Sequence, residues 1–323
     1  MIRYVFGPED LGRVRFASSP LFELAASVQA LRNPDAHGIH APWARATRRR
    51  VHGLEIDLLE AVVPERGYHP DFVTPPPESP RAALEEELAR VRSTPAEQVR
   101  TEVGWAYPGR MPAAARTLLD DPAAGLERLV EQMEAYWQAA IAPYWERLAA
   151  AADADVAHHA RGLAASGPLT MFADLHQRVR WRAGAVEVDH VYDAEVELAG
   201  RGLLLVPAAF VWPELWAMLD PPWQPAIVYA PRGLGTLWEP ARRSGTNALD
   251  GLLGRRRARI LAELDLAVST RELAARMRAS PAGVSEHLSV LRRAGLVAGR
   301  REGRAVLYVR TEAGEALMRA AAG

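Results

Sequence analysis

The segment from Ser269 to Val309 restricts the fold of this chain more than any other part of it. Ser269 stands three residues before Glu272, and this capping-box pattern predicts that a short helix starts there. Ser280-Pro281 predicts a second helix start, because serine is a good N-cap and proline suits the first helical position. Only a tight turn fits between two helices that start so close together.

The second helix has one apolar face and a defined end. Val284, Leu288 and Leu291 repeat at intervals of four and three, which places them on one buried side of a helix. Gly295 stands where a left-handed C-terminal cap belongs, and Leu296 is the apolar residue expected after such a cap. We therefore expect the helix to end directly before Gly295.

Two short runs after this helix predict a β-hairpin. Residues 297–301 and 304–309 flank Glu302-Gly303, and the second run is rich in residues that favour strands. Helix, tight turn, helix and hairpin are the parts of a winged helix-turn-helix domain. The same parts could also end an ordinary α+β domain, so the surface charge has to distinguish the two interpretations.

The outward face of the second helix and the hairpin are polar and basic. A surface that serves only stability would mix charges of both signs, whereas arginines predominate here. We therefore predict that this surface binds double-stranded DNA, with affinity from phosphate contacts and specificity from base contacts in the major groove. The predicted DNA-binding residues are Thr270, Ser280, Ala282, Ser285, Glu286, His287, Ser289, Arg292, Arg293, Arg300, Arg301 and Arg304.

Over roughly the last quarter of the chain, the sequence resembles the winged-helix head of the ArsR-type transcriptional repressors. The resemblance is specific at VSEHLSVLRRAGLV, residues 284–297, and at RREGR, residues 300–304. It implies a sequence-specific, dimeric bacterial regulator whose second helix enters the major groove. Glu286 departs from the family pattern, which usually has a polar or basic residue there. Its carboxylate could accept from a cytosine amino group or pair with Arg292 or Arg293, and both readings stay open.

The length and the charge distribution indicate two domains. A chain of 323 residues is too long for one winged-helix head, at about 150 residues per domain. From Gly251 onward there are 14 arginines and 7 acidic residues, against 25 and 33 in the rest of the chain. We expect an N-terminal regulatory or dimerisation domain at residues 1–240 and the winged helix-turn-helix domain at residues 245–323.

The composition excludes several kinds of chemistry. The chain has no cysteine, and all 39 basic residues are arginines. Disulfides, thiolate nucleophiles, cysteine metal sites and lysine-dependent catalysis are therefore impossible. The absence of cysteine also removes the thiolate metal sites for which the ArsR-type family is named. We expect no cofactor and no enzymatic activity. The first residues do not form a signal peptide, and no apolar run reaches the ~20 residues of a membrane span, so a cytoplasmic protein is expected.

The N-terminal domain is expected to be α+β and mostly helical, with helices grouped before a small antiparallel sheet. Four short β-like runs follow the helices, and Gly200-Arg201-Gly202 is expected to join the second and third runs as a hairpin. A linker is expected at 231–250, before a helix at 252–264 that opens the DNA-binding domain. The arrangement also resembles an uncharacterised domain found ahead of ArsR-type heads. The expected helices span 20–31, 42–50, 54–62, 79–92, 94–105, 112–119, 122–140 and 142–152, and the strands 185–188, 194–198, 203–206 and 226–229.

Histidines and carboxylates come close together in several places without a recognisable spacing. His37 and His40 lie near Gly38, which argues against a helix that would align them. His158 and His159 are adjacent, so on a helix they diverge by about a hundred degrees and we expect a surface pair that cannot share one ion. Asp174-x-His176 and Asp189-His190 lack a nucleophile at a known spacing. No metal site is predicted.

The nine tryptophans are the remaining notable feature of the N-terminal domain. Several of them, with other aromatic residues, gather in and after the expected sheet. An aromatic-lined cavity would suit a small apolar or aromatic effector, while ordinary core packing explains the same residues equally simply. The candidate effector-binding residues are Phe210, Trp212, Trp216, Trp223 and Tyr229.

Together these observations predict a cytoplasmic, homodimeric transcriptional regulator, most simply a repressor of an inverted-repeat operator. The alternatives are an enzyme, or a protein-interaction domain, that carries a DNA-binding tail.

Overall fold

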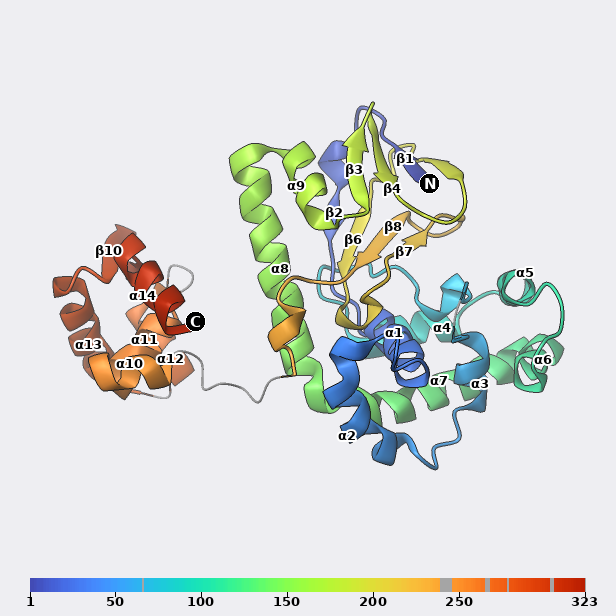
Figure 1. Ribbon diagram of the computed structural model, residues 1–323, viewed down its shortest axis with the longest axis horizontal. Helices are drawn as coiled ribbons and strands as arrows, with labels where there is room; N and C mark the ends of the chain where they lie inside the picture. Colours follow the sequence, from blue (N-terminus) through green and yellow to red (C-terminus); the bar gives the residue numbers. More distant parts are fainter. Residues whose placement is uncertain (66, 239–245, 265–267, 278, 303–304, 323) are drawn as a thin grey trace. The chain divides into compact units, whose positions relative to one another are not determined.

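The computed structural model describes residues 1–65, 67–238, 246–264, 268–277, 279–302 and 305–322. The chain divides into two compact units, Met1–Trp238 and Glu239–Gly323 (Figure 1). These bounds compare with the predicted domains 1–240 and 245–323. The predicted α+β, mostly helical class with a C-terminal helix-turn-helix is confirmed. Among the described residues, no helix is both long and apolar enough to cross a membrane.

Helix α1 (Pro20–Arg32) lies inside the helical part of the N-terminal unit and is buried from Pro20 to Ala30. It begins where the sequence predicts, since Ser19 Oγ accepts a hydrogen bond from the Phe22 amide at 3.2 Å and proline follows the cap. The helices packed with it form the first hydrophobic core. They are α2 (Ala41–Val51), α3 (Asp57–Val62), α4 (Leu84–Arg92), α5 (Ala96–Ala106), α6 (Ala113–Asp120) and α7 (Pro122–Ala140).

Two four-stranded sheets, rather than one, complete this unit, and both are mixed rather than antiparallel (Figure 1). One has the order β3-β4-β1-β5, in which β1 pairs antiparallel with β4 and parallel with β5. The other has the order β2-β6-β8-β7, with β2, β6 and β8 parallel and β7 antiparallel. The strands are β1 (Ile2–Val5), β2 (Arg15–Phe16), β3 (Val179–Arg182), β4 (Ala185–Val188), β5 (Ala194–Glu197), β6 (Leu204–Pro207), β7 (Trp216–Met218) and β8 (Ala226–Tyr229).

The hairpin predicted at Gly200-Arg201-Gly202 is wrong, because β5 and β6 belong to different sheets. Gly202 has φ 65°, and a Cβ there would lie 2.3 Å from the carbonyl oxygen of Arg13. The side chain of Asp10 fixes this turn by accepting a hydrogen bond from the Gly202 amide at 3.0 Å. The glycine therefore serves a close approach between two distant segments, and the strand that pairs with β6 comes from residues 15–16.

Helix α8 (Trp145–Ser166) extends well beyond the predicted end at residue 152. It runs alongside the sheets in Figure 1 and contacts β6. Gly167, with φ 81°, ends it, and α9 (Pro168–Leu175) follows. Neither α9, β3 nor β7 was predicted. A polar network lies between α8, α9 and the end of β8.

The C-terminal unit has its own hydrophobic core. The single helix predicted at 252–264 is two helices, because Gly254, with φ 80°, separates α10 (Thr246–Leu253) from α11 (Arg255–Ala262). Helices α12 (Thr270–Met277) and α13 (Pro281–Arg293) follow, and then the hairpin β10 (Val297–Glu302) and β11 (Ala305–Arg310). The short strand β9 (Val268–Ser269) extends the hairpin to three strands in the order β10-β11-β9, and α14 (Glu312–Ala322) ends the unit.

Candidate nucleic-acid interface

The predicted helix caps are present at both helices of the helix-turn-helix. Ser269 Oγ accepts from the Glu272 amide at 3.3 Å, while a carboxylate oxygen of Glu272 accepts from the Ser269 amide at 3.0 Å. This reciprocal pair is a capping box. Ser280 Oγ accepts from the Gly283 amide at 3.2 Å, so α13 begins at Pro281 as predicted. The caps fix where the second helix starts and hence which of its side chains point outward.

Helix α13 has the two faces that the sequence predicts. Val284, Leu288 and Leu291 are buried in the core of the C-terminal unit. The helix ends at Arg293, two residues before Gly295, whose φ of 72° is left-handed. The Leu296 amide donates to the Leu291 carbonyl at 3.0 Å. The opposite face is solvent-accessible along its length.

Of the predicted DNA-binding residues that the structure describes, most lie at the start or on the accessible face of α13 or on β10, and Thr270 begins α12. Thr270 and His287 are half-buried. In the described part of the chain, Glu286 makes no ion pair with Arg292 or Arg293, so its carboxylate is available to a ligand. Arg304 lies outside the described residues. The exposed members of the set are Ser280, Ala282, Ser285, Glu286, Ser289, Arg292, Arg293, Arg300 and Arg301.

The hairpin uses its arginines in two different ways. Arg300 and Arg301 pair across from Leu307 and Val306 in β11, and both arginines are exposed. Arg310, at the other end of β11, is only 10% exposed at its side chain and forms an ion pair with Glu315 at 2.8 Å. Its guanidinium also donates to the carbonyls of Leu261 and Ala262 at 3.0 and 3.1 Å. Arg310 therefore holds the end of α11 in place and is not a candidate for phosphate contact.

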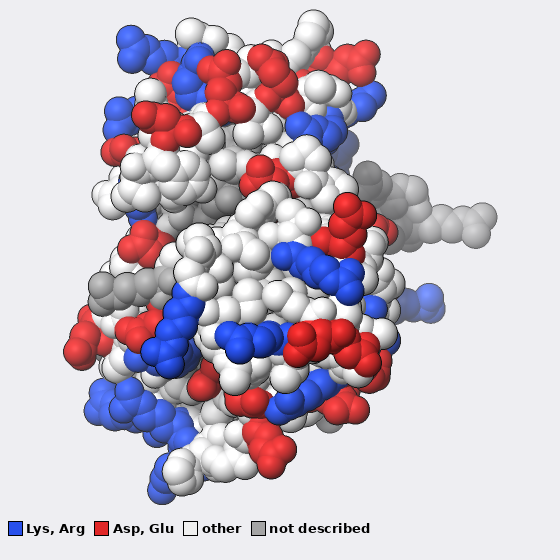
Figure 2. All heavy atoms as spheres, turned by 90° about the vertical axis from the view of Figure 1, so that its right-hand side faces the viewer, with Lys and Arg blue, Asp and Glu red and all other residues white. Residues whose placement is uncertain are grey.

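One face of the N-terminal unit has a different charge pattern. Figure 2 shows its face over α3, α5 and α6, where arginine and carboxylate side chains are interspersed. Ion pairs within this unit include Arg92 with Glu127 at 2.7 Å and Arg128 with Asp57 at 2.8 Å. Mixed charges of this kind provide no continuous positive field for a nucleic acid.

Four of the five candidate effector-binding aromatics pack in or against the first hydrophobic core, and the fifth, Tyr229, belongs to the second. Phe210 is fully buried against Trp43, and Trp212 lies near the ring of His40. Trp216 contacts His69, and the indole of Trp223 donates to Glu102 at 2.8 Å. Tyr229 is buried in the second core. A cleft of about 730 Å³ lies instead beside α2 and α3, where Arg48, Glu55 and Arg128 are among its lining residues.

His40, from the first histidine pair, is a structural residue. Trp238 donates to its Nδ1 at 3.0 Å, so its Nε2 carries the proton and donates to the Ala209 carbonyl at 3.1 Å. Burial, together with the neighbouring His37, lowers the pKa of His40 to about 3. Both ring nitrogens are occupied, which leaves none for a metal ion.

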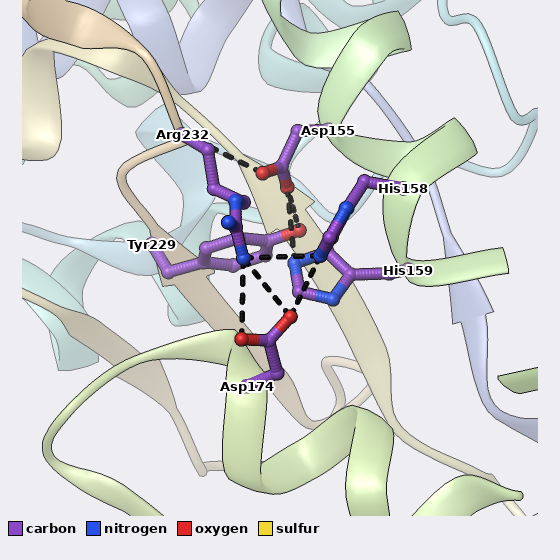
Figure 3. A network of polar contacts seen from close by, with 6 residues as sticks. All are labelled: Asp155, His158, His159, Asp174, Tyr229 and Arg232. Atoms are coloured by element: carbon purple, nitrogen blue, oxygen red, sulfur yellow. Dashed lines mark hydrogen bonds and ion pairs between the residues drawn. The ribbon is translucent and has the colours of Figure 1, made fainter. Parts of the chain in front are cut away.

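The expectation that His158 and His159 form a surface pair is wrong, because His159 is only 1% exposed. Both residues belong to a polar network between α8, α9 and the end of β8 (Figure 3). His158 Nε2 lies 2.7 Å from Asp174 Oδ2, and Nη1 of Arg232 lies 3.0 Å from both atoms. The rings of His158 and His159 and the carboxylate of Asp174 lie close together. They do so although adjacent residues on a helix point in different directions.

A second carboxylate, that of Asp155 on α8, also belongs to the network (Figure 3). It accepts from the Tyr229 hydroxyl at 2.7 Å and from the Arg232 amide at 3.0 Å. The hydrogen bond from His158 lowers the pKa of Asp174, with Arg232 adding to the effect. Burial lowers the pKa of His159, against the opposing effect of Asp155. The sequence shows His158, His159 and Asp174 as candidate polar residues. Helix α9, which places Asp174 beside the two histidines of α8, was not predicted.

Comparisons with known proteins distinguish the two units. A family model described as a helix-turn-helix domain matches residues 255–300, so the C-terminal unit contains a helix-turn-helix domain, the type through which DNA-binding transcription regulators contact DNA. The sequence is similar to the transcriptional regulator HlyU from Vibrio vulnificus CMCP6, with 30% identity over 24% of this chain and 91% of that chain and a TM-score of 0.20. It is also similar to reduced HlyU from Vibrio cholerae N16961, with 31% identity over 24% and 87% of the two chains and a TM-score of 0.21.

No curated protein matches the sequence. The model of a family of unknown function, DUF5937, matches residues 8–103 and 106–233, which is more than half of the chain. The chain therefore belongs to the DUF5937 family and carries a helix-turn-helix domain after the family's own region.

Proposed function

We propose that this protein is a cytoplasmic, homodimeric transcriptional repressor of the ArsR type, without enzymatic activity, that binds an inverted-repeat operator. The exposed polar and basic face of α13 is the observation that carries the proposal. Ser285, Glu286 and Ser289 offer hydrogen-bonding groups for base edges, and the apolar side of the helix is fully engaged in the core. The N-terminal unit would then govern DNA binding, by dimerisation or by sensing an effector.

Affinity would come mainly from arginines around that face. Arg300 and Arg301 on the hairpin are exposed, and so are Arg255, Arg256 and Arg259 on α11. Each phosphate that an arginine neutralises releases condensed counterions, so binding would weaken steeply with salt. A two-fold dimer would place its two α13 helices in major grooves about one or two helical turns apart.

The experiment is selection of bound sequences from random double-stranded DNA with the full chain, followed by affinity measurements on the enriched site. The double variant Arg292→Ala/Arg293→Ala should weaken binding at least tenfold. Arg116→Ala, which removes an arginine from an exposed position of the N-terminal unit, should leave binding unchanged. A selection without an enriched motif, or equal losses for both changes, would contradict the proposal.

Whether the N-terminal unit senses a ligand can be tested separately. A ligand that binds only the folded state raises the unfolding temperature by mass action. Thermal-shift screening of the full chain against apolar and aromatic compounds should therefore identify an effector, whose addition should change operator affinity. Stabilising compounds that leave DNA affinity unaltered would argue that the unit serves dimerisation alone.

A further inference from the structure

The contacts of the Arg232 guanidinium cannot all be favourable at once. Its Nη1 lies 3.0 Å from His158 Nε2 and 3.1 and 3.0 Å from the two carboxylate oxygens of Asp174. An arginine nitrogen only donates, so it requires an unprotonated Nε2 on His158. That lone pair would then face Asp174 Oδ2, which lies 2.7 Å away. If Nε2 carries a proton instead, it donates to Asp174, and the 3.0 Å contact between Nε2 and the guanidinium then joins two donors. One unfavourable contact therefore remains in either case.

A second observation comes from His159. Its side chain is 1% exposed, and its Nε2 has no hydrogen-bond partner, although Asp155 Oδ2 lies 3.4 Å away. A buried ring nitrogen without a partner is unusual, because desolvation of a polar atom has to be offset by a hydrogen bond or a ligand. Figure 3 shows the His159 ring directed toward Asp155 and the carboxylate of Asp174, beside His158.

These atoms have the chemistry and the spacing of metal ligands. One ligand atom from each of His158, His159 and Asp174 can be chosen so that all three lie within 4.8 Å of one another. Among the described residues, this is the group of histidine and carboxylate side chains that meets the spacing. Two imidazole nitrogens and one carboxylate oxygen are a common donor set for zinc and related ions.

We propose that His158, His159 and Asp174 form a binding site for a divalent transition-metal ion of the zinc class, in which the ion replaces the guanidinium of Arg232. The positive charge of Arg232 already lies where these Lewis bases converge, so the ion substitutes one cation for another. Ligands at about 2.1 Å from a tetrahedral ion are roughly 3.4 Å apart. His158 Nε2 and Asp174 Oδ2, now 2.7 Å apart, therefore have to separate slightly to share the ion.

The site is open to solvent on one side, and hydrogen bonds already hold its buried side. The side chains of His158 and Asp174 are 39% and 49% exposed, so an ion reaches them directly from solvent. Asp155 is held by the Tyr229 hydroxyl and the Arg232 amide, and it lies next to the His159 ring. Because the Arg232 amide remains bound to Asp155, only the arginine side chain has to move.

The test is calorimetric titration of the metal-free full chain, without an affinity tag, with zinc chloride. One ion should bind per chain, and Co²⁺ should give the visible absorption bands of tetrahedral coordination. His158→Gln and Asp174→Asn should each weaken binding at least tenfold. His52→Gln, which changes an exposed histidine outside the network, should bind as the unaltered chain does.

Arg232→Met provides the sharpest variant, because it keeps the backbone hydrogen bond to Asp155 and removes the competing cation. It should bind zinc at least tenfold more tightly than the unaltered chain, and zinc should raise its unfolding temperature further. An overturning result would be no saturable binding, unchanged affinity in His158→Gln, or equal or weaker affinity in Arg232→Met. A variant that fails to fold is recognised by its far-ultraviolet circular dichroism, and the Arg232→Met result then decides.

Discussion

Glu23 lies near the start of α1 with its carboxyl group buried in the first core, only 3% exposed. It accepts hydrogen bonds from the amides of Ala209 and Phe210 at 2.7 and 3.1 Å, and so joins α1 to the segment after β6. Burial raises the pKa of Glu23 to about 7, although both amides oppose that effect. Glu87, which accepts from the Leu21 amide at 2.9 Å, has its pKa raised to about 7 by burial as well.

These carboxyls predict how stability depends on pH. A pKa raised in the fold means that the native state holds a proton that the unfolded chain releases, so stability decreases as pH rises from about 4.5 through 7. Glu23→Gln should therefore flatten the fall in unfolding temperature between about pH 4.5 and pH 7. The measurement is calorimetry at several pH values, with the exposed Glu85→Gln as the matched control. An unchanged slope in Glu23→Gln would show that Glu23 titrates normally.

His287 gives a prediction for DNA recognition. It is half-buried on α13 between exposed Glu286 and the buried Leu288. If its ring reaches a base edge, His287→Ala should cost about 1–3 kcal/mol on the selected site and little on random DNA. Competition binding with both DNAs measures the difference. Equal losses on the two DNAs would assign His287 to phosphate contact or to packing.

The helix-capping residues and the residues of the polar network differ in how well the sequence alone predicts their roles. Ser269, Ser280 and Gly295 act within a few residues of themselves, so their caps were predictable from local pattern. His158 and His159 were misjudged because helix geometry separates adjacent Cβ atoms, while long imidazole side chains can still converge on Asp174 from a neighbouring helix. Such convergence depends on how α8 meets α9, which no local pattern encodes.

At the scale of elements, the hairpin of the C-terminal unit combines a structural anchor and a candidate binding edge. Arg310 is held by Glu315 and two carbonyls at the end of α11, whereas Arg301 is exposed on the opposite strand. A cation suits the C-terminal end of a helix, where carbonyl groups lack partners. Replacing Arg310 should therefore lower stability, whereas replacing Arg301 should weaken DNA binding.

Arg310→Ala should destabilise the C-terminal unit by roughly 2–3 kcal/mol, because a charged hydrogen-bonding group leaves a mostly buried position. Arg301→Ala should leave the unfolding temperature unchanged and weaken DNA binding. Denaturant unfolding and DNA titration of both variants make the comparison. Loss of stability in Arg301→Ala would contradict this division of roles.

The turn at Gly202 was misread because glycine serves hairpins and close approaches alike. Its left-handed φ excludes most side chains, and a Cβ added there would lie 2.3 Å from the Arg13 oxygen. Gly202→Ala should therefore cost about 2 kcal/mol or more in stability. Gly12→Ala, where no atom lies within 4 Å of the added Cβ, should cost far less. Thermal unfolding of both variants tests the assignment, and equal stabilities would refute it.

At the scale of the whole molecule, the two units differ in their balance of basic and acidic residues. The unit that contains the helix-turn-helix is arginine-rich, and the DUF5937 region carries an excess of acidic residues. Length, charge and the Gly/Pro-rich segment near residues 231–250 were sufficient to predict two units. They could not predict two mixed sheets, because β2 and β1 pair with strands that lie far along the chain.

The charge distribution predicts the salt dependence of DNA binding. Binding should weaken steeply between about 50 and 200 mM salt if phosphate contacts dominate. Arg300→Ala/Arg301→Ala should reduce the slope of log affinity against log salt by about two, because each arginine that binds a phosphate contributes about one. Titrations at several salt concentrations give the slope. A slope that the double change does not alter would exclude these arginines from phosphate binding.

The position of β1 between β4 and β5 has a consequence for biosynthesis. Residues 2–5 leave the ribosome well before residues 185–197, where both neighbours that complete their hydrogen bonding lie. The first strand therefore waits, unpaired, until most of the N-terminal unit has been translated. An unpaired strand edge is a template for intermolecular association. Nascent chains stalled before residue 185 should consequently depend on chaperones more than those stalled after residue 238.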